Sequence, residues 1–309
     1  MGKLAFVFPG QGAQAVGMGK DAYETAAASR QIIDRADEAL GFALSRLIFE
    51  GPEEQLKQTA NTQPALLAVS TALLAAFKIH GVQPDYVAGH SLGEYSALVA
   101  AGAISYEDAL RTVRARGEFM EQAVPGGEGA MAAVLGAERA ALGRLCEAVS
   151  GESGIVELAN VNCPGQIVVS GSAAGVAAVV QRCKEAGAKR AIPLEVSGPF
   201  HSSLMQPAAD QLRGVLAGLQ LQDAAVPVIA NVTASPVTDS ESIRRLLAEQ
   251  VVSPVLWEDS VRYMLDHGVD TFIEIGSGTV LAGLIRKIDK SVRVVSINNA
   301  GAIEAYTTN

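Results

Sequence analysis

Short apolar runs that favour β-strands alternate with longer runs that favour helices along most of this 309-residue chain. This alternation constrains the fold more than any other feature, because it is typical of a layered α/β fold. Ser105 followed by Asp108 resembles a capping box, which predicts the start of one long helix. Outside one segment, the expected strands are Leu4–Phe8, Tyr86–Ala88, Thr271–Ile275 and Arg293–Ile297, and the expected helices are Ala65–Ile79, Glu94–Ala101, Ser105–Ala123 and Thr279–Ile288.

The exceptional segment begins after the glycine-rich joint Pro125–Gly127 and ends near Ser197–Pro199. Its expected order of elements, βαββαβ, is typical of the ferredoxin-like split unit. We therefore expect residues 1–125 and 198–309 to form the main α/β core and residues 126–197 to form a small inserted subdomain. The elements expected in it are strands Ala130–Leu135, Ile155–Val161, Gln166–Ser170 and Lys189–Val196 and helices Glu138–Val149 and Ala174–Ala186.

The composition excludes intrinsic disorder and disfavours nucleic acid as a partner. Hydrophobic residues make up 49% of the chain and charged residues only 18%, so there is ample material for a large core. The 24 Lys and Arg residues against 33 Asp and Glu residues give a net charge of −9, which repels phosphate backbones. An anionic substrate must therefore be held by a few locally placed cations.

Cysteine spacing and hydropathy argue against a secreted or membrane protein. Cys146, Cys163 and Cys183 form neither a disulfide framework nor a zinc-binding pattern, which favours a reducing compartment. The longest apolar stretch, Pro64–Phe77, is shorter than the roughly 20 residues of a membrane span and is interrupted by polar residues. We expect a soluble, cytoplasmic protein with no membrane partner.

The sequence Gly89-His90-Ser91-Leu92-Gly93 has the GxSxG pattern of a nucleophile elbow. An expected strand precedes it and an expected helix follows it, as the elbow requires, and the small flanking residues allow a sharp turn. The N-terminus of the helix would also stabilise an oxyanion. These features identify Ser91 as a candidate nucleophile; the alternative is a glycine-rich turn without catalysis.

Four histidines are candidates for the base that accepts the serine proton. His80 and His267 each precede a glycine at the end of an expected helix, where a histidine interacts favourably with the helix dipole. His90 adjoins Ser91 within the turn and is expected to pack there. By elimination, His201, in an irregular stretch before a helix, is the candidate base.

An oxyanion hole at such an elbow uses two backbone amides. The first is that of Leu92, directly after the nucleophile. The loop Gly10-Gln11-Gly12 after the first strand is the best candidate for the second, because glycines let a backbone N–H approach closely. The alternative is a plain tight turn. A phosphate-binding loop is disfavoured, because no Gly-Lys-Ser/Thr follows.

Arg116 occupies an unusual place in the helix that begins near Ser105. It shares a narrow stripe with Ala109, Val113 and Met120, at a position where an apolar residue is expected. A buried guanidinium is permanently charged and needs an anion. Two alternatives stay open: an internal salt bridge, or a bidentate clamp on a substrate carboxylate.

Six motifs in chain order carry a resemblance to a known family. Together they resemble the malonyl-CoA:acyl carrier protein transacylases of dissociated (type II) fatty-acid synthesis, over a stretch from Phe8 to about Ile288. Modular polyketide synthase acyltransferase domains are the nearest relatives of that family. The motifs are Gly10-Gln11-Gly12-Ala13-Gln14, Asn61-Thr62-Gln63-Pro64, the elbow with Glu94-Tyr95, Arg116-Gly117, Phe200-His201-Ser202, and Gln250 with Ser253-Pro254.

The resemblance implies a hydrolase-like parallel-sheet core with an inserted ferredoxin-like domain and an active site in the cleft between them. It implies ping-pong transfer of malonyl from malonyl-CoA to the phosphopantetheine thiol of acyl carrier protein, which supplies fatty-acid elongation. Malonyl-CoA and the carrier protein are then the expected partners, and no metal or other cofactor is expected.

The resemblance also implies a role for each site residue. Ser91 would be acylated and His201 would be its base. The backbone amides of Gln11 and Leu92 would form the oxyanion hole. Arg116 would bind the free carboxylate of malonyl.

Two further expectations depend on the resemblance. The backbone carbonyl of Gln250 would orient the histidine in place of the acid of a triad; the local sequence alone identifies Gln250 only as a residue at a helix end. In polyketide relatives an aromatic residue before the histidine accompanies malonyl rather than methylmalonyl units, and Phe200 stands at that position.

Three alternatives stay open. One is a free-standing polyketide-type acyltransferase with a different extender unit. The second is a serine thioesterase, which expects an acid between the serine and the histidine in chain order; no acid stands out there at the end of a core strand. The third is a non-catalytic module that docks carrier proteins through Lys184, Lys189 and Arg190.

Overall fold

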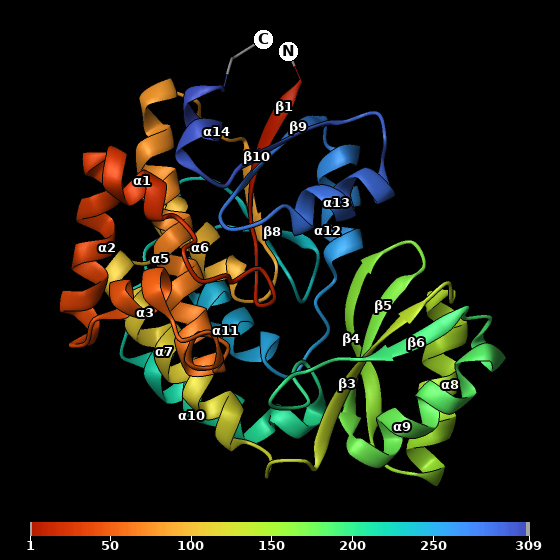
Figure 1. Ribbon diagram of the computed structural model, residues 1–309. Coiled ribbons are helices and arrows are strands. Elements are labelled where there is room, and N and C mark those ends of the chain that lie inside the picture. The colour runs from red at the N-terminus through yellow and green to blue at the C-terminus, as the bar shows by residue number, and fades with distance from the viewer. Residues whose placement is uncertain (1, 307–309) are drawn as a thin grey trace.

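The computed structural model, which describes residues 2–306, contains two separate sheets (Figure 1). The larger has the order β10-β9-β1-β2-β7-β8, and all its neighbours are parallel except the pair β7 and β8. The parallel-sheet core predicted from the sequence is therefore present. Its strands are β1 (Lys3–Phe8), β2 (Tyr86–Gly89), β7 (Val228–Ala230), β8 (Ser235–Val237), β9 (Val269–Ile275) and β10 (Arg293–Ile297).

Helices cover both faces of this sheet, as a parallel sheet requires. Side chains alternate along β1, so that Phe6 and Phe8 pack in one hydrophobic cluster and Ala5 and Val7 in another. The first cluster lies against α5, α6 and α7, and the second against α12 and α13. The helices outside the second sheet are α1 (Lys20–Thr25), α2 (Ala27–Leu40), α3 (Leu44–Glu50), α4 (Glu53–Leu56), α5 (Thr59–Phe77), α6 (Gly93–Ala100), α7 (Tyr106–Gln122), α10 (Gln206–Ala217), α11 (Ser240–Gln250), α12 (Trp257–Asp266), α13 (Val280–Ile288) and α14 (Ala300–Glu304), with short 3₁₀ turns at Lys78–His80 and Ser203–Met205.

The helix α5 is a core helix of this protein. With the 3₁₀ turn that follows, it is long and apolar enough to cross a membrane, but 83% of its most apolar window is buried by the rest of the chain. Pro64 lies inside it and has no N–H for the carbonyl of Ala60. Arg114 of α7 donates to that carbonyl at 3.1 Å instead, which ties α7 to α5.

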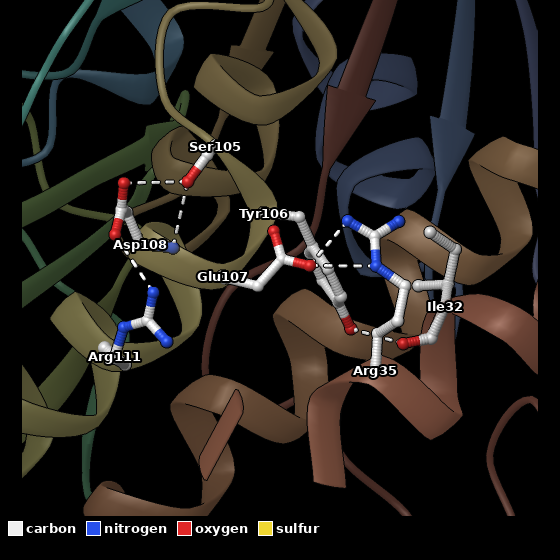
Figure 2. A network of polar contacts seen from close by, with 7 residues as sticks. All are labelled: Ile32, Arg35, Ser105, Tyr106, Glu107, Asp108 and Arg111. Carbon is white, nitrogen blue, oxygen red and sulfur yellow. Dashed lines mark hydrogen bonds and ion pairs between the residues drawn. The ribbon is translucent and has the colours of Figure 1, made fainter. Parts of the chain in front are cut away.

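The helix α7 is fixed at its first turn (Figure 2). The hydroxyl of Ser105 accepts a hydrogen bond from the backbone N–H of Asp108 at 3.1 Å, as the capping pattern predicts. The hydroxyl of Tyr106 donates to the carbonyl of Ile32 on α2 at 3.0 Å. These contacts set the position of the helix that carries Arg116.

The second sheet has the order β4-β5-β3-β6 and is antiparallel throughout (Figure 1, green). One face is covered by α8 and α9, and the other faces the main core, where Met131 and Val168 join its hydrophobic cluster. The predicted strand Lys189–Val196 is shorter than expected, because its pairing ends at Pro193. The elements are β3 (Gly129–Leu135), α8 (Arg139–Glu152), β4 (Val156–Cys163), β5 (Gln166–Ser172), α9 (Ala173–Arg182), a 3₁₀ turn at Cys183–Ala186, and β6 (Arg190–Pro193).

Candidate active site

Ser91 lies on a sharp turn between β2 and α6. Its φ of 51° is in the left-handed region, which costs a residue other than glycine about 1–3 kcal/mol. The flanking residues must be glycines because a side chain at either position would clash with the backbone. A Cβ on Gly89 would lie 1.9 Å from the backbone of Gly93, and a Cβ on Gly93 would lie 2.1 Å from the carbonyl oxygen of Phe8. This is the strained geometry expected of a nucleophile elbow.

The side chain of His201 is directed at this serine. Ser91 Oγ lies 2.7 Å from His201 Nε2, and His201 Nδ1 lies 2.9 Å from the backbone oxygen of Gln250. A carbonyl only accepts, so Nδ1 carries the hydrogen and Nε2 has the free lone pair that a base needs. Burial, and next the charge of Arg116, lower the pKa of His201 to about 3, so the imidazole is neutral at neutral pH.

The other three histidines have different surroundings. His80 Nε2 lies 2.8 Å from the carbonyl oxygen of Ile303, and His267 ends α12 with Nδ1 near the carbonyl of Tyr263. His90 points away from the serine and lies 2.8 Å from Asn162 Oδ1, and burial lowers its pKa. The structure therefore brings only His201, among the four, into hydrogen-bond contact with the elbow serine.

Arg116 is 1% exposed and points into the same site. Its Nη1 donates to Gln63 Oε1 at 2.8 Å, and its Nη2 donates to Ser91 Oγ at 3.1 Å and to Gln250 Oε1 at 3.0 Å. The guanidinium also lies over the ring of Tyr95, 5.6 Å from its centroid. Among residues 2–306 no carboxylate oxygen lies within 4.0 Å of it, so the internal salt bridge considered above is not formed.

The two amides expected in an oxyanion hole lie beside the serine. Gln11, Ser91 and Leu92 line one cavity, and within the described chain neither the amide of Gln11 nor that of Leu92 has a protein acceptor. The loop before Gln11 touches the elbow closely, because a Cβ on Gly10 would lie 2.2 Å from the carbonyl oxygen of His90. This contact explains why glycine stands there.

Asn231 is a site residue that the sequence did not reveal. Its Oδ1 accepts a hydrogen bond from the backbone N–H of Ser91 at 2.7 Å, and its Nδ2 donates to the carbonyl of Gly89 at 2.7 Å. The side chain thus bridges the strained turn. It follows the three-residue strand β7 at the carboxyl edge of the parallel sheet, and that position was the only available signal.

A cleft between the main core and the second sheet surrounds Ser91. One cavity of about 120 Å³ contains Ser91, Arg116 and His201, and a second of about 260 Å³ adjoins it through shared lining residues. A larger hollow of about 440 Å³ near Phe42 and Arg114 shares no lining residue with either and contains no nucleophile and base pair. The residues shared by the first two cavities are Gln11, His90, Asn160 and Leu194.

Comparisons with known proteins agree with this arrangement. Residues 5–304 match the family described as acyl transferase domain. The chain is 55% identical to a malonyl CoA-acyl carrier protein transacylase of Bacillus subtilis (strain 168), over 98% of this chain and 96% of the relative. It superposes with a TM-score of 0.95 on an acyl carrier protein S-malonyltransferase of Vibrio cholerae, at 46% identity over 98% of this chain and 99% of the other.

A further solved structure includes a carrier protein. It is described as a type II PKS acyl-carrier protein in complex with its malonyl-transacylase, and it matches with a TM-score of 0.95 at 41% identity, over 98% of each chain.

Proposed function

Because this chain belongs to the malonyl-CoA:acyl carrier protein transacylases of the acyl transferase family, we propose that its reaction passes through a malonyl ester on Ser91. The enzyme transfers malonyl from malonyl-CoA to the phosphopantetheine thiol of acyl carrier protein and supplies fatty-acid elongation. The observation that carries the assignment of the site is a buried guanidinium, 3.1 Å from the serine hydroxyl, that has no carboxylate partner within residues 2–306.

In the first half-reaction, His201 Nε2 takes the proton of Ser91 Oγ as the oxygen attacks the thioester carbonyl of malonyl-CoA. The carbonyl oxygen becomes an oxyanion, which the amides of Gln11 and Leu92 stabilise. The C–S bond then breaks, and His201 gives its proton to the departing CoA sulfur. The product is malonyl-serine.

In the second half-reaction, the carrier's thiol gives its proton to His201 and attacks the malonyl-serine. The same two amides hold the second oxyanion, and His201 returns the proton to Ser91 as the ester breaks. The backbone carbonyl of Gln250 accepts a hydrogen bond from His201 Nδ1–H and so fixes the orientation of the ring. This carbonyl takes the place of the acid of a triad. A thioester is exchanged for a thioester, so the reaction is close to balanced in energy and reversible.

Arg116 selects the acyl group. When Ser91 Oγ carries the acyl group, Arg116 no longer donates to it, and one hydrogen of Nη2 becomes available. Nη1 also has a hydrogen that is not used by Gln63, so both nitrogens can donate to the malonyl carboxylate. Phe200 lines the same cavity and restricts space near the acyl chain. A single side chain of this kind discriminates by about 1–3 kcal/mol.

The remaining expectations are proposals about the whole chain. Residues 1–125 and 198–309 form the catalytic core, and residues 126–197 form a ferredoxin-like inserted subdomain; the chain order β3-α8-β4-β5-α9-β6 supports this. No redox cofactor is needed, because ester and thioester exchange changes no oxidation state, and no metal is needed where the amides of Gln11 and Leu92 stabilise the oxyanion. The protein acts in the cytoplasm.

Lys184, Lys189 and Arg190 lie exposed on the second unit, and their contact with the carrier stays a prediction.

Intact-mass measurement tests this function. The enzyme is mixed with malonyl-CoA, methylmalonyl-CoA and acetyl-CoA in competition, and one malonyl group should appear on the protein. Ser91→Ala should stay unmodified. With malonyl-CoA alone, release of one equivalent of CoA indicates a trapped acyl-enzyme, whereas steady release would show a thioesterase and contradict the proposal.

A further inference from the structure

A buried acid and a buried cation lie in the same network without pairing. Glu94, on the first turn of α6, is 3% exposed, and Arg116 is 1% exposed. A buried guanidinium usually forms an ion pair with a buried carboxylate when one is within reach. Here no carboxylate oxygen lies within 4.0 Å of Arg116 among residues 2–306.

The side chain of Gln250 lies between the two charged groups. Its Oε1 accepts a hydrogen bond from Arg116 Nη2 at 3.0 Å, and its Nε2 donates to Glu94 Oε2 at 2.8 Å. The orientation of this carboxamide is fixed by Arg116, because a guanidinium only donates and its partner must therefore be the carboxamide oxygen. Turning the amide over would place its NH₂ against the guanidinium.

Asn231 and the elbow hold Gln250 in this place. Gln250 Nε2 also approaches the carbonyl of Ser91 at 3.1 Å and Asn231 Oδ1 at 3.3 Å. The backbone N–H of Asn231 donates to Glu94 Oε2 at 2.9 Å. Glu94 Oε2 therefore accepts from two N–H donors, neither of which belongs to Arg116.

We infer that the Gln250 carboxamide is a specificity-determining spacer: it keeps the Arg116 guanidinium from pairing with Glu94 and so leaves it open to the carboxylate of a dicarboxylic acyl group. The inference rests on the proposed function of Arg116. A neutral amide oxygen binds a guanidinium more weakly than a carboxylate does, so the substrate's carboxylate is not outcompeted. Gln250 thus has two separate roles, with its backbone carbonyl on His201 and its side chain on Arg116.

The direct test is Gln250→Glu. This change keeps the length of the side chain and the backbone carbonyl on His201, but it places a carboxylate on Arg116. The ratio of kcat/KM for malonyl-CoA to that for acetyl-CoA should fall at least tenfold, mainly through a higher KM for malonyl-CoA, because the new carboxylate competes only with an anionic acyl group.

A matched variant exchanges the two groups, with Glu94→Gln and Gln250→Glu in one chain. It conserves the charge and the size of the network and moves only the position of the carboxylate. The same fall in the malonyl to acetyl ratio is expected. Glu94→Gln alone leaves a neutral amide on Arg116, so its ratio should stay within threefold of that of the parent enzyme.

Thermal unfolding of each variant is measured alongside. The exchanged variant decides the question should Gln250→Glu alone fail to fold. A ratio within threefold of the parent in the exchanged variant, or a parallel decline with both substrates, would overturn the inference. If the parent enzyme itself acquires no malonyl group on Ser91, the proposed function fails instead, so the two failures are distinguishable.

Discussion

The two sides of the cleft differ in what they supply. The main core contributes every group to which a chemical step is assigned, including the nucleophile, the base and the buried cation. The second sheet and the segment after it contribute mostly apolar walls, namely Met131, Leu194 and Val196, with the amide of Asn160. The difference indicates that charge recognition and catalysis belong to the main core, whereas the second unit supplies apolar walls of the cavity.

The largest effect is expected from the charged group of the core. Arg116→Ala should lower kcat/KM for malonyl-CoA at least a hundredfold, because the acyl carboxylate loses its counter-charge in a buried site. Loading of acetyl should be spared or should increase. Competition between the two thioesters, followed by intact mass, measures this. An unchanged preference for malonyl would remove Arg116 from its role.

The charge of Arg116 should also affect the lowest pH at which His201 acts as a base. The pKa of His201 is lowered to about 3 by burial first and by Arg116 second, so in the parent enzyme the imidazole stays neutral and active well below pH 6. Arg116→Ala removes the second cause, so the pKa of His201 should rise and the loss of activity on acidification should begin at higher pH. The pH profile of kcat/KM with acetyl-CoA, whose acyl group does not ionise, tests this. If the parent enzyme and Arg116→Ala lose activity over the same acidic pH range, the prediction is wrong.

A change on the other side of the cleft should matter less. Leu194 lines both cavities and is 37% exposed, so Leu194→Ala removes a wall with little cost to folding. Malonyl loading should change by less than tenfold, because Leu194 is partly exposed and only part of its apolar contact is lost. A loss as large as that of Arg116→Ala would break the division of roles between the two sides.

A final prediction concerns stability rather than catalysis. Burial raises the pKa of Glu94 to about 7, opposed by hydrogen bonds from Asn231 and Gln250 and by the charge of Arg116. The folded state therefore keeps a proton that the unfolded chain has lost, so the free energy of unfolding should fall between about pH 4.5 and pH 7, by up to about 3 kcal/mol. Glu94→Gln should show a shallower fall. Urea unfolding at pH 5 and pH 8 measures the difference, and equal slopes in the two proteins would be the contrary result.

Local sequence was sufficient for part of the fold and for part of the site. It did not indicate the strands β7 and β8 or the bounds of the helices α1–α4, α10–α12 and α14. The strand before Gly89 and the helix after Gly93 are where the pattern predicts them, and the cap at Ser105 is confirmed. Elimination among the histidines reached His201, since the others fitted helix ends or the turn. The stripe of α7 placed Arg116 inside the protein, but two interpretations of its partner stayed open until the structure showed no carboxylate beside it in the described part of the chain.

The network behind the serine was not predictable from local patterns. Asn231 is 140 positions from Ser91, and Gln250 is 156 positions from Glu94. An asparagine after a short strand and a glutamine at a helix end have many ordinary roles, and nothing in their neighbourhood indicates which distant donor or acceptor they meet.

The sequence by itself determined the strands β1, β2, β9 and β10, the helices α5, α6, α7 and α13, the sharp turn at Ser91 and the presence of a cation among apolar positions. These depend on periodicity, glycine placement and residue type within a few positions. The resemblance to a known family implied that the backbone carbonyl of Gln250 faces His201. Only the tertiary structure decided that the Gln250 carboxamide lies between Arg116 and Glu94. Hydrogen bonds between distant segments depend on how the sheet and helices pack together, and that packing brings the segments within 3 Å of one another.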